Sequence, residues 1–288
     1  MKKFLSFLSV MLLVLVFSSP AKSIPIDRGW NMDLTSLGGA NYENILNITF
    51  TGSSYLNQQL TGPGIPGGFT LQDGDIFTES TILQQLSLTS PEGFVTTIEN
   101  VYFYGENLTG FVTNVNNAGQ SPDPGAWSFE YVFTDADTLG IYYFEDPVNV
   151  NDPFAFAPGL GTNIALFDNV EGQGDAPLNF VGGGTGFSGS TELSGTFSYV
   201  LGDVFTTSWG APFEDLIADP KWEVLGFMEL TNWILEGDLN YTFGDGFFDS
   251  TIRHSGDFQV AAIPEPTTLL LFATGLLGMA FLGRRKRL

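Results

Sequence analysis

Four short segments place aspartates close together in turn-like sequence, where carboxylate and carbonyl oxygens can converge on one cation. They are Asp73-Gly-Asp75, Asp135-Ala-Asp137, Asp168 to Asp175, and Asp245 to Asp249. Hard oxygen ligands of this kind suit Ca²⁺, so Asp168, Asp175, Asp135 and Asp137 are candidate calcium ligands and Ca²⁺ is the one cofactor that we consider. None of the segments matches the EF-hand loop or the RTX repeat. Asp and Gly are also ordinary turn residues, so both interpretations stay open.

A second group of carboxylates lies among aromatic residues. Glu223, Glu229 and Glu236 are interspersed with Trp222, Phe227 and Trp233. Sugar binding favours such surroundings, and a pair of carboxylates can hydrolyse a glycosidic bond. A sheet edge whose polar face contacts solvent explains the same pattern, and we favour that interpretation.

His254 is the one histidine of the chain, which has no cysteine. Thiol chemistry and multi-histidine metal sites are therefore excluded. Ser255 and Asp257 lie near His254, but nothing resembles a G-x-S-x-G nucleophile elbow, and we expect an exposed or half-buried histidine on a strand. We expect neither catalytic nor cofactor-binding residues, and predict a protein that is not an enzyme.

The region that must position these residues is strongly acidic. Between residues 24 and 262 the basic residues are Arg28, Lys221 and Arg253, against 31 acidic residues, a formal charge of −28. Such a field repels phosphates, so we expect no nucleic acid partner. It also attracts divalent cations.

The same region has the alternating pattern of β-strands. Phe129, Tyr131 and Phe133 recur at every second position, as do Ile48 and Phe50. Segments rich in Gly and Pro, such as 61–68 and 181–189, are expected to separate the strands, and residues 221–236 to form one long strand or a strand pair. A helical turn is expected only over 212–219. We predict one all-β domain over 24–262, a β-sandwich or jelly-roll-like fold; a split near residues 149–158 is the alternative.

The N-terminal end has the organisation of a secretory signal peptide. Lys2 and Lys3 precede an apolar stretch from Phe4 to Phe17, and small residues follow before residue 24. We therefore interpret residues 1–23 as a cleaved export signal.

The C-terminal end combines three elements in order. Pro264-Glu265-Pro266 precedes an uncharged apolar segment, 267–283, and then the basic residues Arg284, Arg285, Lys286 and Arg287. The length of 267–283 predicts a short transmembrane helix, and the basic tail predicts a cytoplasmic C-terminus. An ordinary membrane anchor with a proline-rich stalk is the alternative interpretation.

Residues 263–288 resemble the PEP-CTERM sorting signal of Gram-negative bacteria. The resemblance implies that exosortase, a membrane-embedded transpeptidase, recognises and processes the chain at Pro264, Glu265 and Pro266. It also implies association with extracellular polysaccharide, flocs or biofilm.

We therefore expect Sec-type export, a transient anchor in the inner membrane, and a final location in the cell envelope, at the cell surface or in the extracellular matrix. The expected role is structural or adhesive, with divalent cations bridging the acidic surface to acidic glycans. A secreted glycan-active hydrolase or a lectin-like carbohydrate-binding module is the alternative.

Overall fold

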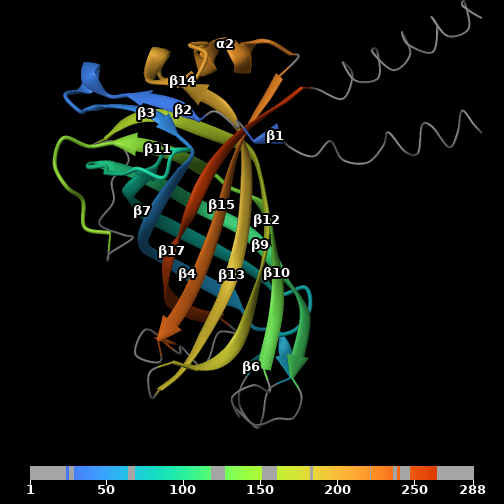
Figure 1. Ribbon diagram of the computed structural model, residues 1–288. Coiled ribbons are helices and arrows are strands. Elements are labelled where there is room, and N and C mark those ends of the chain that lie inside the picture. Colours follow the sequence, from blue (N-terminus) through green and yellow to red (C-terminus); the bar gives the residue numbers. More distant parts are fainter. Residues whose placement is uncertain are drawn as a thin grey trace, which may run out of the picture.

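A computed structural model of the 288-residue chain describes residues 24–25, 29–63, 69–117, 127–150, 161–181, 184–220, 222–235, 239–240 and 247–264. Over these residues the chain folds into an antiparallel barrel of long, coiled strands with a small cap at one end (Figure 1).

Eight strand positions close the barrel within the described residues. In chain order they are β4 (Asn47–Gln59), β7 (Ile76–Thr89), β9 (Val101–Asn117), β10 (Trp127–Asp135) continued by β11 (Thr138–Tyr143), β12 (Thr162–Val181), β13 (Gly184–Val200), β15 (Trp222–Leu235) and β17 (Phe247–Pro264). Each position pairs with the next, and β17 pairs with β4 to complete the ring. β10 and β11 share one position because both pair with β9 on one side and β12 on the other.

The β-sandwich or jelly-roll prediction is therefore wrong, although the all-β character is right. A two-residue alternation marks strands and their buried face, and it is the same in a sandwich and in a barrel. The difference lies in whether the first and last strands meet. Here Thr51 Oγ1 donates a hydrogen bond to the His254 carbonyl oxygen across 203 positions, which no local pattern reveals.

A cap covers the end of the barrel at which β4 begins and β17 finishes. Its strands and helices are β2 (Trp30–Asp33), η1 (Thr35–Leu37), β3 (Asn41–Ile45), η3 (Gly202–Val204), β14 (Phe205–Thr207) and α2 (Phe213–Ala218). Trp30 is buried at its centre, with ring centroids 5.7 Å from Phe205, 6.3 Å from Phe213 and 6.5 Å from Phe258 of the barrel. These contacts join the cap to the barrel core.

The remaining strands are short. They are β1 (Ile24–Pro25) and β16 (Leu239–Asn240) on β17, β8 (Val95–Thr97) on β7, and the pair β5 (Gly62–Pro63) and β6 (Phe69–Thr70). β6 lies at the end of the barrel opposite the cap (Figure 1).

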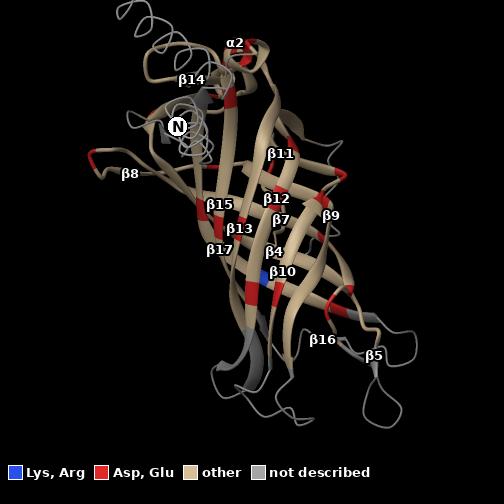
Figure 2. Ribbon diagram, turned by 90° about the vertical axis from the view of Figure 1, so that its right-hand side faces the viewer, with Lys and Arg blue, Asp and Glu red and all other residues tan. Residues whose placement is uncertain are grey.

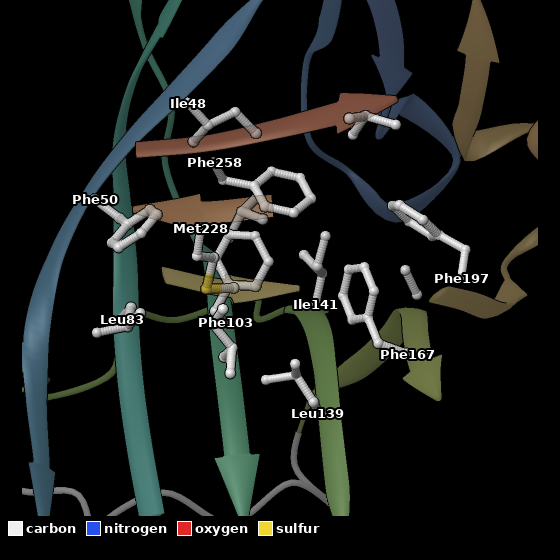
Figure 3. Packing of buried hydrophobic residues seen from close by; sticks show 14 of the residues in the cluster. Ile48, Phe50, Leu83, Phe103, Leu139, Ile141, Phe167, Phe197, Met228 and Phe258 are labelled. Atoms are coloured by element: carbon white, nitrogen blue, oxygen red, sulfur yellow. The ribbon is translucent and has the colours of Figure 1, made fainter. Parts of the chain in front are cut away.

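Apolar side chains fill the barrel and polar side chains cover it. Phe103 lies at the centre of the filling, with ring centroids 4.7 Å from Phe258, 5.7 Å from Phe50 and 6.4 Å from Phe167 (Figure 3). Asp and Glu residues are spread along the strands and loops of the barrel (Figure 2). Among the described residues Arg253 is the one Lys or Arg.

Two local expectations need comment. The helical turn predicted over 212–219 is confirmed as α2, and β15 is one strand. The expectation that it is the only such turn is wrong, because η1 and η3 are short 3-10 turns elsewhere. The strand break predicted over 181–189 is wrong for the described residues of that range, since Val181 belongs to β12 and 184–189 belong to β13. Gly189 lies inside β13. A Cβ atom there would lie 1.7 Å from the Asp175 carbonyl oxygen, so this glycine permits a close approach between β13 and β12.

The terminal predictions fall largely outside the described residues. These are the signal peptide 1–23, the transmembrane helix 267–283 and the basic tail with Arg284, Arg285, Lys286 and Arg287. The described part contains no helix that is long and apolar enough to cross a membrane.

Candidate binding site in the barrel lumen

Polar side chains form a compact cluster inside the apolar barrel. Glu79 of β7 shares its inward face with Phe77 and Leu83, and His254 of β17 shares its inward face with Ile252. Their side chains are 8–9% and 2% exposed, and His254 Nε2 lies 3.2 Å from Glu79 Oε1. The expectation of an exposed or half-buried histidine is wrong, because β17 turns this residue into the closed lumen.

Asn232 fixes the protonation of one ring nitrogen of His254. It lies directly opposite His254 in the pairing of β15 with β17. Its amide nitrogen donates to the Tyr131 hydroxyl at 2.9 Å and to Thr191 Oγ1. Its Oδ1, 2.8 Å from His254 Nδ1, is therefore an acceptor, so Nδ1 carries a hydrogen.

The second ring nitrogen of His254, Nε2, has a hydrogen-bond partner in both the neutral and the cationic form of the ring. Ser54 Oγ lies 2.7 Å from His254 Nε2 on one side, and the Glu79 carboxylate lies on the other. In neutral histidine the Ser54 hydroxyl donates to Nε2, whereas in the cationic form the Nε2 hydrogen faces the Glu79 oxygen. The cluster can therefore hold or release one proton without losing the hydrogen bond at Nδ1.

Tyr131 of β10 completes the cluster. Its hydroxyl lies 2.6 Å from Thr191 Oγ1. Burial raises the pKa of Tyr131 far above 10.0, and the nearby Glu79 and Asp175 carboxylates add to this shift, while the hydrogen bonds with Thr191 and Asn232 oppose it. Tyr131 is therefore a neutral hydroxyl at physiological pH.

A cavity of about 40 Å³ borders this cluster. It is lined by Leu56, Gln58, Phe77, Glu79, Phe129, Tyr131, Asp175, Ala176, Ser188, Gly189, Asn232 and Ile252. Its lining residues Leu56 and Gln58 of β4 and Ile252 of β17 lie toward the ends of those strands that are away from the cap. Glu79 also lines a second void of about 10 Å³. Thr81 is another of its lining residues, and the buried Thr81 hydroxyl oxygen has no hydrogen-bond partner in the described part of the chain.

Ser54, His254 and Asn232 have the sequence of contacts that an activated serine requires. Ser54 is fully buried, however, and is not among the residues that line either void. A substrate could not reach its hydroxyl in this arrangement, so we assign these residues to the folding of the lumen. The absence of enzymatic activity stays a prediction.

The candidate calcium ligands do not gather into one group. Asp168 and Asp175 both lie on β12, seven positions and roughly 20 Å apart along the strand at the usual strand rise. Asp175 Oδ1 accepts hydrogen bonds from the backbone and hydroxyl of Ser190. Within the described residues, no set of three His, Cys, Asp or Glu side chains could hold a metal ion.

The second candidate pair lies at the junction of β10 and β11. Asp135 Oδ1 accepts from the Ala136 backbone at 2.9 Å, and Asp137 Oδ2 accepts from Asn107 at 2.7 Å. Both carboxylates are exposed. Calcium binding by these aspartates stays a prediction.

The carboxylates expected among aromatic residues are spread along β15. Glu223 Oε1 accepts a hydrogen bond from Thr196 at 3.1 Å, and Glu229 lies six positions further along the strand. Glu236 lies outside the described residues. Glu223 and Glu229, which lie on the same strand, therefore do not form a pair of carboxylates facing each other across a cleft.

The sequence interpretation missed Glu79, Asn232, Tyr131, Ser54 and the burial of His254. A signal was present: Glu79 falls in phase with Phe77 and Leu83, and His254 in phase with Ile252. A polar residue on the apolar face of an alternating strand indicates a polar group inside the core.

The sorting motif begins where the barrel ends. Pro264 is the last residue of β17 and pairs with Trp222. Glu265 and Pro266 lie outside the described residues. The segment to be processed therefore follows the final barrel strand without an intervening domain.

Comparison with known proteins recognises this end of the chain. A family model described as the PEP-CTERM protein-sorting motif matches residues 262–287. The C-terminal segment carries this motif, which marks the chain as an exported substrate of exosortase, processed at the membrane. No curated protein matches the chain.

Two solved structures show a weak likeness. The NanC porin in a rhombohedral crystal form has a TM-score of 0.13 at 7% identity, covering 74% of this chain and 98% of that one. An outer membrane channel from Pseudomonas putida F1 has a TM-score of 0.13 at 12% identity, covering 77% and 98%. At such scores neither supports an argument about this chain.

Proposed function

We propose that the barrel is a structural or adhesive component of the cell surface or extracellular polysaccharide matrix, delivered there by exosortase, with no catalytic step of its own. The sorting motif at 262–287 is the observation that supports delivery. The acidic residues that are spread along the barrel strands (Figure 2), among them the exposed Glu192 and Glu229, support the matrix role.

A row of carboxylates crosses three neighbouring strands of this wall. Glu192 of β13 is opposite Glu229 of β15, which is in turn opposite Asp257 of β17. Like charges directly opposite on a sheet repel one another. Divalent cations held between this row and an acidic glycan would relieve the repulsion and attach the barrel to the matrix.

The delivery part is tested by separating native cells into membrane, matrix and medium fractions and measuring the intact mass of the protein in each. We expect a chain truncated near residue 265 in the matrix. A variant with Pro264, Glu265 and Pro266 all replaced by Ala should keep its full C-terminus. Finding the unchanged protein with a full C-terminus in the membrane fraction would contradict the proposal.

The cation bridge is tested by releasing the protein from the matrix with EDTA. Replacing Glu192→Gln, Glu229→Gln and Asp257→Asn together should weaken retention. The matched control replaces Glu92→Gln, Glu145→Gln and Asp203→Asn, which removes the same charge from scattered exposed positions. Equal retention of the two triple variants would show that net charge, and not the row, determines attachment.

The predicted calcium site is tested separately by thermal unfolding. A specific site gives a melting temperature that rises with calcium and saturates, whereas screening of the acidic surface follows ionic strength. An equal effect of calcium chloride and of sodium chloride at matched ionic strength would rule the specific site out.

A further inference from the structure

The Glu79 carboxylate is buried with fewer partners than a buried charge requires. Its contact with His254 Nε2 is its one polar contact among the described residues. Carboxylates removed from water are normally neutralised or hydrogen-bonded several times. Glu79 borders both voids of the lumen, so its remaining hydrogen-bonding capacity is directed at space that another molecule can occupy.

The polar groups around the larger cavity favour a hydrogen-bond donor. Gln58 Nε2 already donates to the carbonyl oxygens of Gln59 and Ile76, which leaves its amide oxygen as an acceptor. Both amide hydrogens of Asn232 are used inside the cluster. No described Lys or Arg side chain lines the cavity.

Aromatic rings form much of the rest of the wall. The ring centroid of Tyr131 lies 5.8 Å from that of Phe77 and 6.1 Å from that of Phe129. The faces of aromatic rings attract cations. Leu56 and Ile252 supply aliphatic surface beside them.

We propose that this cavity binds a small organic ammonium ion, whose charged nitrogen donates to Glu79 and whose carbon atoms contact the aromatic and aliphatic wall. A water molecule needs about 10–15 Å³ of such space, so about 40 Å³ accepts a head group of the size of methylammonium. The formal charge of −28 on residues 24–262 raises the local concentration of cations.

The protonation state of His254 determines whether Glu79 is available to a ligand cation. Neutral His254 keeps its hydrogen bonds with Ser54 and Asn232, so Glu79 is then free to bind a ligand cation. Protonated His254 places its own charge beside Glu79 and competes. The other titratable groups at the cavity are Tyr131 from β10 and Asp175 from β12; β4, β13 and β15 contribute uncharged side chains. The affinity for the ammonium ion therefore falls as His254 becomes protonated.

The test is a titration of the exported, purified protein with methylammonium chloride, following the methyl resonances of Leu56 and Ile252 by NMR. We expect saturable shifts that sodium chloride at equal ionic strength and methanol do not produce. Glu79→Gln should weaken binding about tenfold or more, because a charged hydrogen bond is lost. Glu92→Gln, which removes an exposed carboxylate outside the cavity, should leave binding unchanged.

Two results would overturn the proposal: shifts no larger than those with sodium chloride, or equal affinity of Glu79→Gln and the unchanged protein. Where Glu79→Gln fails to fold, the wild-type protein alone provides the test. Saturable methylammonium shifts at Leu56 and Ile252 that neither methanol nor sodium chloride produces support the site, and shifts that methanol reproduces contradict it. The outcome is independent of whether the barrel binds polysaccharide.

Discussion

His254 and Glu79 form a buried pair inside the barrel, with His254 Nε2 3.2 Å from Glu79 Oε1. Removing one member of a buried pair costs about 3–5 kcal/mol, because the other stays buried without compensation. His254→Ala leaves the Glu79 carboxylate in that position. We expect its free energy of unfolding in urea to fall by this amount, whereas Gln259→Ala, on the exposed face of the same strand, should change it little. A loss for His254→Ala as small as that of the control would show that the pair is not charged.

Gly256 is a second residue whose replacement has a defined cost. It lies between Phe50 and Leu230 of the neighbouring strands, and a Cβ atom there would be 2.0 Å from the Glu229 carbonyl oxygen. Gly256→Ala forces the backbones of β15 and β17 apart, and overpacking of this kind costs about 1–3 kcal/mol. Thermal unfolding beside Ser255→Ala, the adjacent outward position, measures the difference. Equal melting temperatures would mean that the strands separate freely.

At the scale of elements, the segment after β11 covers the outer face of the barrel. Tyr102, Tyr104, Tyr142, Phe144 and Ile82 form a small apolar cluster there. The Val148 backbone donates to the Tyr102 hydroxyl at 2.9 Å, and the Ser53 hydroxyl donates to the Val150 carbonyl at 2.6 Å. These two bonds attach residues 148–150 to the strands.

Tyr102→Phe removes one of these attachments and keeps the ring. We expect a loss of about 1 kcal/mol, the usual net value of one hydrogen bond, and faster hydrogen exchange at the Val148 amide. Tyr199→Phe, at an exposed tyrosine, is the matched control. Unchanged exchange at Val148 would show that the packing of the cluster alone holds the segment.

The elements also show how far the sequence can predict this molecule. Alternation in β10 identifies Phe129, Tyr131 and Phe133 as one face, and the structure places that face inside. Closure of the barrel depends on β17 meeting β4, a pairing between distant segments that local alternation does not encode. The lumen cluster draws its members from six strands, since Thr191 of β13 joins residues of β4, β7, β10, β15 and β17. Barrel closure decides which of these residues meet, so the pattern of any one strand does not predict the cluster.

At the scale of the whole molecule, buried tyrosines make the fold sensitive to alkaline pH. Burial raises the pKa of Tyr104 from 10.0 to about 12, and the neighbouring Glu106 and Tyr142 add to the effect. Above pH 10 the unfolded chain releases phenolic protons that the folded chain retains. The stability contribution of these groups is therefore complete below about pH 10 and is lost as the pH rises towards 12.

Urea unfolding at pH 8, 9.5 and 11 measures this loss, with tyrosine ionisation followed by absorbance. We expect a drop in the free energy of unfolding between pH 9.5 and 11 that is smaller in Tyr104→Phe. The Tyr199→Phe control should retain the full drop, because that side chain is exposed. A Tyr104→Phe protein with an undiminished drop would assign the sensitivity to other groups.

The chain enters and leaves the barrel at one place, since β1 sets Ile24 and Pro25 against Ala262 and Ala261 of β17. This has a mechanical consequence for any force that acts on the chain through the C-terminal end of β17. A load applied at the far end of the barrel acts along β15 and β17, whose hydrogen bonds lie across the strands and resist shear together. A load that separates the two chain ends breaks the short pairing of β1 first. The barrel therefore resists force along its axis, and under force between the chain ends the pairing of β1 with β17 breaks first.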